Sequence, residues 1–230
     1  MQSEWQLRRE IVEIGKRAYD RNFVTATDGN ISVRVMGDRL LITPSGSCLG
    51  ELKPEHLIYV DMDGKVFGGK GKPTSELPMH LTVYRERSDI KAVIHAHPPI
   101  TTGFTIAGES LAQCVIPEVV MMFGTIPTTE YATPATEQGA NVIKKLIKDN
   151  DALILDRHGT LTVGKNLMGA YRKLEKVEYC ARVTVTAFQL GRIKTLSVEE
   201  IEEIEAIRTK HGYSDRASLC KECRICQTND

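Results

Sequence analysis

The sequence predicts an α/β fold, an α/β/α sandwich in which helices cover a largely antiparallel central sheet. Two pairs of short alternating segments are each separated by a Gly-Asp or Asp-Gly turn, which is typical of β-hairpins. Segments with apolar residues at steps of three and four precede and follow these pairs, as in amphipathic helices. Hairpins placed between helices favour an antiparallel sheet over a doubly wound parallel one.

The first part of the chain is expected to supply one helix and two hairpins. Residues 5–22 have an apolar stripe and predict a helix that lies against the sheet. Residues 31–35 and 40–43 form the first predicted hairpin, and residues 57–60 and 65–67 the second.

A capped helix and a short apolar strand follow the hairpins. Ser75 is suited to cap a helix that runs through Leu77, Leu81 and Tyr84. Residues 91–95 predict a strand that gives way to a loop at the HAHPP sequence.

The rest of the chain predicts three more helices and a strand pair. The helices cover residues 134–148, 167–190 and 198–210, and the strands cover residues 152–155 and 161–163. The last helix is expected to place four apolar side chains on one stripe, with its glutamates in solvent. These four are Val198, Ile201, Ile204 and Ile207.

Composition indicates a cytoplasmic protein without a general attraction to nucleic acid or membranes. The 230 residues include 30 basic and 30 acidic side chains, so the formal net charge is zero. The apolar runs are too short to cross a bilayer, and the first eleven residues, MQSEWQLRREI, lack the apolar core of a secretion signal.

The chain is expected to form one catalytic domain, residues 1–212, followed by a tail, residues 213–230. No Gly-, Pro- or Ser-rich linker and no internal repeat divides it. The tail holds Cys220, Cys223 and Cys226, which suit a metal or redox site but equally a tail with reducible thiols.

The sequence lacks the motifs of two common enzyme classes, the P-loop nucleotide hydrolases and the serine hydrolases. Residues 64–70 match the start of a phosphate-binding P-loop, but Gly71 stands where Ser or Thr should hold magnesium. No Gly-x-Ser-x-Gly sequence occurs, so a serine hydrolase of that type has no nucleophile.

The strongest signal for chemistry is the sequence His95-Ala96-His97. Residues i and i+2 of an extended chain point to the same side, so both imidazoles can bind one cation. His158, after the apolar strand ALILD, is the favoured third ligand, although a histidine in a surface turn would have the same pattern. Three histidines with an open fourth position are typical of a catalytic zinc site.

Residues Thr74, Ser75 and Glu76 suit an anion-binding helix N-terminus, where free N–H groups and hydroxyls gather. An ordinary N-cap explains the same residues. Two turns, residues 27–30 and 43–46, have a similar character. His80 lies one helical turn after Glu76, where a packed or supporting role is favoured over metal binding.

Six short motifs follow one another along the chain: GNIS (29–32), ITPSG (42–46), TSE (74–76), HAHPP (95–99), YATP (131–134) and RHG (157–159). Taken in this order, they resemble the zinc-dependent class II aldolase family, and within it the L-fuculose-phosphate aldolases. The resemblance spans residues 5–212.

The resemblance implies a homotetramer with active sites between subunits and one Zn²⁺ per subunit. His95, His97 and His158 match the zinc ligands of the family. Glu76 matches its acid/base, which can also occupy the fourth coordination position. The residues that match its phosphate-binding loops are Gly29, Asn30, Ser45, Gly46, Thr74 and Ser75.

The implied reaction is reversible cleavage of a ketose 1-phosphate to dihydroxyacetone phosphate and an aldehyde such as lactaldehyde. Alternatives on the same scaffold are a 5-deoxyribulose or methylthioribulose 1-phosphate aldolase or dehydratase, and a sugar-phosphate 4-epimerase. Epimerases typically have Asp at the position of Glu76. A non-catalytic, adducin-like module is expected to lack the metal histidines.

The L-fuculose-phosphate aldolases use one tyrosine after the HxH motif and another near the C-terminus, and this sequence departs from both positions. Residues 101–130 contain no tyrosine, and Glu118 falls near the first position. At the second, near the C-terminus, the spacing places His211, with Tyr213 two residues later, as possible contributors across a subunit interface. The aldehyde that the enzyme accepts is therefore left open.

Overall fold

The computed structural model describes residues 3–36 and 38–210. Predictions about His211, Tyr213 and the three tail cysteines lie outside these residues. Within them, one seven-stranded sheet forms the centre of the molecule, with strands in the order β4-β3-β2-β1-β5-β7-β6. Every strand pair of this sheet is antiparallel, as predicted. The strands are β1 (Asn30–Val35), β2 (Arg39–Ile42), β3 (Ile58–Val60), β4 (Val66–Gly68), β5 (Ala92–Ala96), β6 (Ala152–Leu155) and β7 (Gly159–Gly164).

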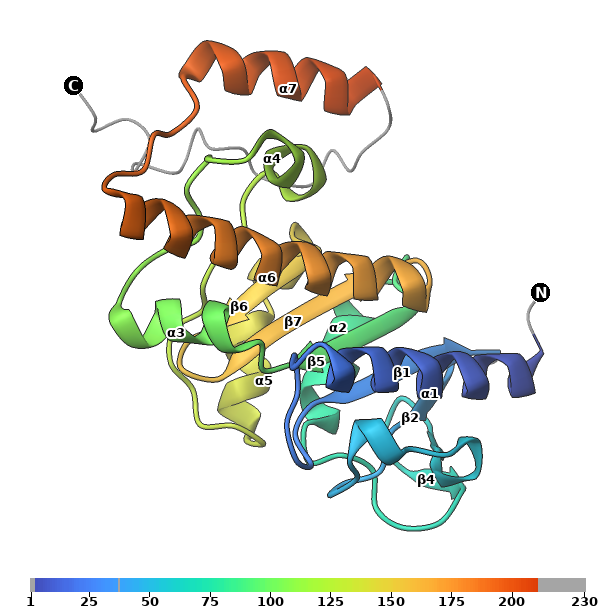
Figure 1. Ribbon diagram of the computed structural model, residues 1–230. Coiled ribbons are helices and arrows are strands. Elements are labelled where there is room, and N and C mark those ends of the chain that lie inside the picture. Colours follow the sequence, from blue (N-terminus) through green and yellow to red (C-terminus); the bar gives the residue numbers. More distant parts are fainter. Residues whose placement is uncertain (1–2, 37, 211–230) are drawn as a thin grey trace.

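Helices cover both faces of the sheet, so the predicted three-layer α/β/α arrangement is confirmed (Figure 1). On one face, α1 and α6 pack through residues such as Ile14 and Leu174. On the other face, α2 and α5 pack through residues such as Leu81 and Ile143. The helices are α1 (Glu4–Asp20), α2 (Leu77–Glu86), α3 (Pro99–Ala107), α4 (Pro117–Phe123), α5 (Glu137–Ile143), α6 (Leu167–Leu190) and α7 (Val198–Lys210), with short 3-10 helices at Leu49–Glu51, Pro54–His56 and Leu146–Lys148.

Side chains on the two central strands, β1 and β5, point alternately to the two faces of the sheet. This alternation decides which of them lie on the face of the candidate site. On β5, Ala92, Ile94 and Ala96 belong to the core under α1 and α6, whereas Val93 belongs to the core under α2. His95 follows the same alternation and lies on the α2 face. On β1, Ile31 and Val33 face α1, so Asn30 and Ser32 face α2.

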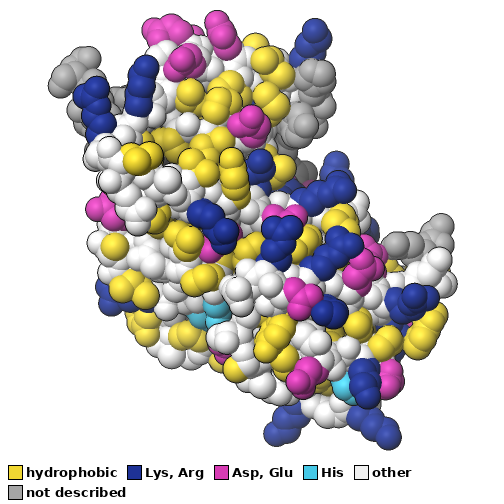
Figure 2. Space-filling view, viewed as in Figure 1, with side chains coloured by type: hydrophobic (Ala, Val, Ile, Leu, Met, Phe, Trp, Pro, Cys, Tyr) yellow, Lys and Arg dark blue, Asp and Glu magenta, His cyan; other side chains and the backbone are white. Residues whose placement is uncertain are grey.

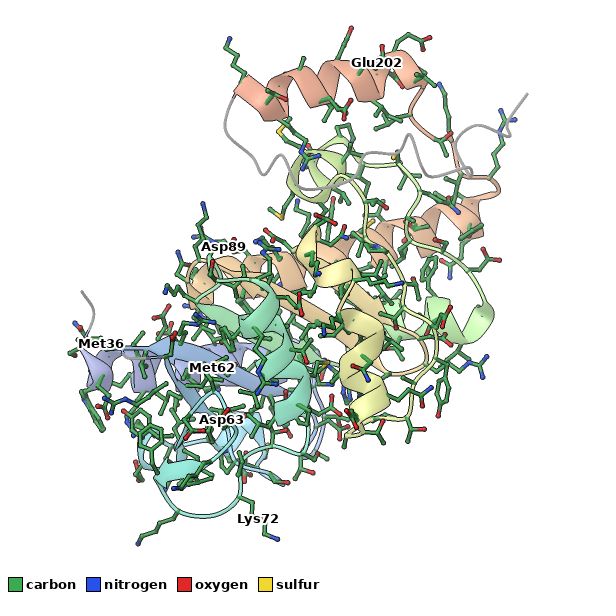
Figure 3. All side chains as sticks on the ribbon, turned by 180° about the vertical axis from the view of Figure 1, so that it is seen from behind. Met36, Met62, Asp63, Lys72, Asp89 and Glu202 are labelled. Atoms are coloured by element: carbon green, nitrogen blue, oxygen red, sulfur yellow. The ribbon has the colours of Figure 1, made fainter. Side chains whose placement is uncertain are left out.

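The last helix lies outside the three layers. Figures 1 and 3 both show α7, which carries Glu202, stacked on α4 and separated from the sheet. Ile201 and Ile204 are buried against Val120 of α4, whereas Val198 and Ile207 are about half exposed. Only two of the four predicted stripe residues are therefore buried.

Several predicted elements differ from the structure. The third helix is shorter than residues 134–148, because Thr136 caps α5 through a hydrogen bond from the Gly139 backbone N–H (3.3 Å), and the chain continues after α5 as a separate 3-10 helix. The loop predicted at HAHPP is limited to His97 and Pro98, because helix α3, which was not predicted, begins at Pro99; proline is well tolerated in a first helical turn. Helix α4 was not predicted.

Ser75 does not cap α2. The N-cap residue is Glu76, and it makes no side-chain cap hydrogen bond. The Thr74 hydroxyl instead accepts a hydrogen bond from the Glu76 backbone N–H (3.2 Å), and proline in the first turn removes one N–H that would need a partner.

Charges of both signs are interspersed on the face covered by α1 and α6 (Figure 2). This surface agrees with the zero net charge and offers no large region of one sign. Among the helices of the described residues, none is long and apolar enough to cross a membrane.

Candidate active site

Three histidines from two distant parts of the chain converge at one end of the sheet. His95 is the fourth residue of β5, His97 follows that strand, and His158 lies in the turn between β6 and β7. Their ring centroids are 4.6 to 5.0 Å apart. One potential ligand atom from each ring lies within 4.8 Å of the others, so all three can reach a common ion.

Strand pairing explains why His158 meets the HAH sequence. Strand β7 pairs with β5, and Ala96 lies opposite Thr160, so the turn before β7 lies beside the end of β5. Gly159 makes this approach possible. A Cβ atom at Gly159 would lie 2.3 Å from the Ala96 carbonyl oxygen and 2.8 Å from Cδ2 of His97, which leaves no room for a side chain.

His95 is held with one ring nitrogen facing its neighbours. Its Nδ1 lies 2.9 Å from the Thr160 carbonyl oxygen, which can only accept, so Nδ1 carries the hydrogen and Nε2 has the free lone pair. That Nε2 lies 2.8 Å from Nε2 of His97. Burial, followed by the proximity of His97 and His158, holds the pKa of His95 well below its usual value, which favours the neutral, ligating form.

Asp28 lies behind His97. The Asp28 carboxylate is 3.6 Å from Nδ1 of His97, the ring nitrogen that faces away from His95. Burial and His158 lower the pKa of His97, and Asp28 opposes this shift. A carboxylate behind a ligating imidazole is a common feature of metal sites, where it orients the ring.

Glu76 completes the cluster. Its Oε2 lies 3.4 Å from Nε2 of His95 and 3.9 Å from Nε2 of His158. Its Oε1 accepts a 2.7 Å hydrogen bond from the backbone N–H of Ala135, in the loop before α5. Burial raises the pKa of Glu76, which brings this carboxyl closer to the range where a group can both accept and donate a proton.

The donor set fits a divalent metal ion. Zinc takes imidazole nitrogens at about 2.0–2.1 Å, so tetrahedral ligands lie roughly 3.3 Å from one another. The distance between Nε2 of His95 and Nε2 of His97 is 2.8 Å, somewhat shorter than this value. The distance from Nε2 of His95 to Oε2 of Glu76 is 3.4 Å, close to it. Three neutral imidazoles beside a carboxylate form a donor set that suits zinc.

A cleft with an empty volume of about 550 Å³ opens beside the histidines. It brings the six predicted phosphate-loop residues together with the three histidines and Glu76. None of its described lining residues is Lys or Arg, so an anion there would depend on hydroxyl, amide and backbone donors. The six are Gly29, Asn30, Ser45, Gly46, Thr74 and Ser75.

Backbone hydrogen bonds join two of these loops. The Ser45 N–H donates to the Lys72 carbonyl (2.9 Å), and the Thr74 N–H donates to the Thr43 carbonyl (3.2 Å). The Lys72 side chain itself lies at the outer edge of the molecule (Figure 3).

Sequence reasoning missed several groups that support the cluster. Asp28 was interpreted only as a turn residue, although its position beside the GNIS motif was a signal. Buried Glu178 of α6 accepts hydrogen bonds from the backbone N–H groups of Ile100 (3.1 Å) and Thr101 (2.9 Å) and from the Thr101 hydroxyl (2.7 Å), which fixes the start of α3 just after His97. No local sequence pattern predicts this contact, because the residues that form it are far apart in the chain.

Comparisons with known proteins agree with this architecture. Residues 9–185 match the family described as Class II Aldolase and Adducin N-terminal domain. An L-fuculose phosphate aldolase of Methanocaldococcus jannaschii is 36% identical over 178 residues, which are 77% of this chain and 95% of that protein. A 3-oxo-tetronate 4-phosphate decarboxylase of Escherichia coli strain K12 is 33% identical over 209 residues, 88% of this chain and 97% of its own.

A solved structure of an L-fuculose 1-phosphate aldolase has the same fold. It superposes with a TM-score of 0.81 at 32% identity, covering 89% of this chain and 96% of that chain. Fold and sequence together define the protein as an enzyme, a lyase of the aldolase type. It belongs to the class II aldolase family.

Proposed function

We propose that the protein is a zinc-dependent aldolase that reversibly cleaves a ketose 1-phosphate of the L-fuculose 1-phosphate type. Its products would be dihydroxyacetone phosphate and an aldehyde such as lactaldehyde. The observation that carries the proposal is the single cleft that unites three imidazoles, Glu76 and the donor-rich loops. The proposal includes a catalytic domain over residues 1–212, a tail over residues 213–230, and a cytoplasmic homotetramer with active sites between subunits.

His95, His97 and His158 would hold the zinc ion, with Glu76 available as a fourth ligand before substrate binds. Bound there, zinc would supply Lewis-acid stabilisation of the negative charge that develops on substrate oxygens when the carbon–carbon bond breaks. The Thr160 carbonyl holds the His95 tautomer, and Asp28 lies where it can orient His97.

Glu76 would move the proton at the carbon that loses its bond. Its Oε1 is held by the hydrogen bond from the Ala135 N–H, which positions the carboxylate. Its Oε2 faces the histidines and is the oxygen that would accept and donate the proton. A raised pKa makes proton return from this group easier.

The substrate phosphate would be bound by the loops at residues 29–30, 45–46 and 74–75. These groups hold a remote part of the substrate, so their binding energy positions the reacting carbons beside Glu76 and the histidines. Neutral donors leave the metal ion as the main positive charge near the reacting oxygens.

Decarboxylation of a 3-oxo-acid phosphate is the second candidate, which the motifs alone did not raise. It is favoured by the 33% identity to the decarboxylase of Escherichia coli, which extends over 88% of this chain. Loss of carbon dioxide from such an acid also leaves negative charge beside a carbonyl, so the same site would serve both reactions.

Product analysis separates the candidates. The zinc-loaded protein would be incubated with L-fuculose 1-phosphate, 5-deoxyribulose 1-phosphate, methylthioribulose 1-phosphate and 3-oxo-tetronate 4-phosphate. Release of dihydroxyacetone phosphate from a ketose 1-phosphate is expected. Carbon dioxide from the oxo acid alone, a dehydrated diketone or a 4-epimer as the only product would each replace the aldolase assignment. Absence of bound metal after zinc reconstitution would favour a non-catalytic module.

A further inference from the structure

A chain of buried polar side chains lies directly behind Asn30. His80 of α2 is fully buried, and its Nε2 lies 2.5 Å from Oδ1 of Asn30 on β1. Its Nδ1 lies 2.6 Å from the Ser32 hydroxyl, which lies 2.9 Å from the Tyr84 hydroxyl. The single hydrogen of the Tyr84 hydroxyl can point to the Ser32 hydroxyl or to the Ser32 backbone carbonyl, which is 3.0 Å away.

The direction of these hydrogen bonds follows from what each atom can do. An amide oxygen only accepts, so Nε2 of His80 carries the hydrogen that it donates to Asn30. The other ring nitrogen, Nδ1, can then accept from the Ser32 hydroxyl, which lies 2.6 Å away.

The consequence for Asn30 is a fixed amide. Its oxygen is occupied on the buried side by His80, while Asn30 itself lines the cleft. The amide NH₂ group is therefore the part that can reach a ligand. Reversal of the amide would place two donors, Nε2–H and NH₂, against each other and would present an oxygen to the ligand.

We propose that His80 is a positioning residue that selects for anionic, phosphate-bearing substrates by locking the Asn30 amide with its N–H donors toward the cleft. The inference rests on the proposed function, because it requires the phosphate to bind at Asn30. It assigns His80 no contact with substrate or metal; its effect is carried by the Asn30 side chain.

The decisive variants separate the hydrogen bond from the packing. His80→Phe keeps a flat ring but removes the donor, and His80→Gln retains an N–H near the position of Nε2. Ser32→Ala removes the hydroxyl that holds the His80 tautomer. Thr162→Val is the matched control, because it removes another fully buried hydroxyl from the same sheet, one that bonds the Ile94 carbonyl and not Asn30.

Binding of inorganic phosphate and of dihydroxyacetone phosphate to the zinc-loaded proteins would be measured by calorimetry. His80→Phe should weaken both about 10- to 100-fold, the range expected for a hydrogen bond to a charged group. His80→Gln should recover most of the affinity, Ser32→Ala should lose less than His80→Phe, and Thr162→Val should bind as the wild type does. Zinc stoichiometry should be the same in all.

Kinetics supply the readout that a merely structural role would not change. The ratio of kcat/KM for a ketose 1-phosphate to that for the unphosphorylated ketose should fall in His80→Phe and recover in His80→Gln. Equal phosphate affinity in wild type and His80→Phe, or equal losses in His80→Phe and His80→Gln, would overturn the inference alone. If His80→Phe does not fold, unchanged binding in Ser32→Ala would do so. No phosphate binding by the wild type would overturn the proposed phosphate loops and this inference together.

Discussion

At the scale of single residues, Glu76 is a buried carboxylate in the cleft whose two oxygens have different partners. It is 8% exposed, faces two histidines with one oxygen and anchors the Ala135 loop with the other. A carboxylate with this placement can act on a proton without moving far. Its position at the start of α2 also gives its backbone a fixed place relative to β5.

Replacement of Glu76 by Gln should abolish most turnover while zinc remains bound. Gln keeps an oxygen that can accept from the Ala135 N–H but cannot take up a proton, so a loss of roughly 10²- to 10⁴-fold in kcat is expected. Steady-state kinetics and metal analysis check this. Glu137→Gln, at an exposed position of α5, removes the same charge and should retain full activity. Wild-type turnover in Glu76→Gln would refute the proton-transfer role.

The sequence alone indicated the three histidines proposed as metal ligands, but not the groups that orient them. The HxH spacing and the turn after ALILD are local patterns, so they can be recognised without a structure. The Thr160 carbonyl, the Ala135 N–H and Glu178 act through contacts between residues that are 59 to 78 positions apart along the chain. Such contacts exist only after the sheet has formed.

At the scale of elements, the helices and strands that were predicted correctly have a regular spacing of apolar residues, whereas the missed helices do not. Helix α6 over Leu167–Leu190 and the two hairpins have long or regular patterns, and the structure confirms them. Helices α3 and α4 have nine and seven residues and each begins at proline, so their sequences resemble loops. Ala135, with φ of +58°, and the Thr136 cap shorten the helix predicted from residue 134.

The junction between β5 and β7 should not tolerate a side chain at Gly159. In Gly159→Ala the new methyl would meet the Ala96 carbonyl, which is backbone and cannot rotate away, and the His97 ring. We expect zinc affinity to fall at least tenfold and the free energy of unfolding to fall by about 2 kcal/mol. Metal titration and urea denaturation measure the two effects.

Gly103→Ala is the matched control for this substitution. A Cβ atom at Gly103, inside α3, would meet nothing within 4 Å, so alanine should raise stability by about 0.5–1 kcal/mol and leave zinc affinity unchanged. If the two variants behaved alike, the close approach of the strands would not be what positions His97.

At the scale of the whole molecule, buried histidine links stability to pH. The folded state holds the pKa of His80 at about 3, against 6.5 for the free side chain, because burial disfavours the charged form. Between these two pH values the unfolded chain binds a proton that the folded chain does not. Stability is therefore complete above about pH 6.5 and is lost as the pH falls toward 3.

His80→Gln should reduce this pH dependence. In metal-stripped protein, each pH unit below about 6 should cost wild type about 1.4 kcal/mol more of unfolding free energy than it costs the variant. Urea denaturation of both proteins at pH 7.5, 6 and 5 measures the difference. Parallel stability curves for the two proteins would show that His80 is not the buried, neutral group described here.

The proposed chemistry depends on one metal ion bound by residues from both halves of the chain. Crystals of the zinc-reconstituted protein, measured on both sides of the zinc absorption edge, test this most directly. The predicted result is a single strong anomalous peak about 2.0–2.1 Å from one ring nitrogen each of His95, His97 and His158, beside Glu76. A map without a peak at this position, or with zinc bound only elsewhere, would contradict the proposed chemistry.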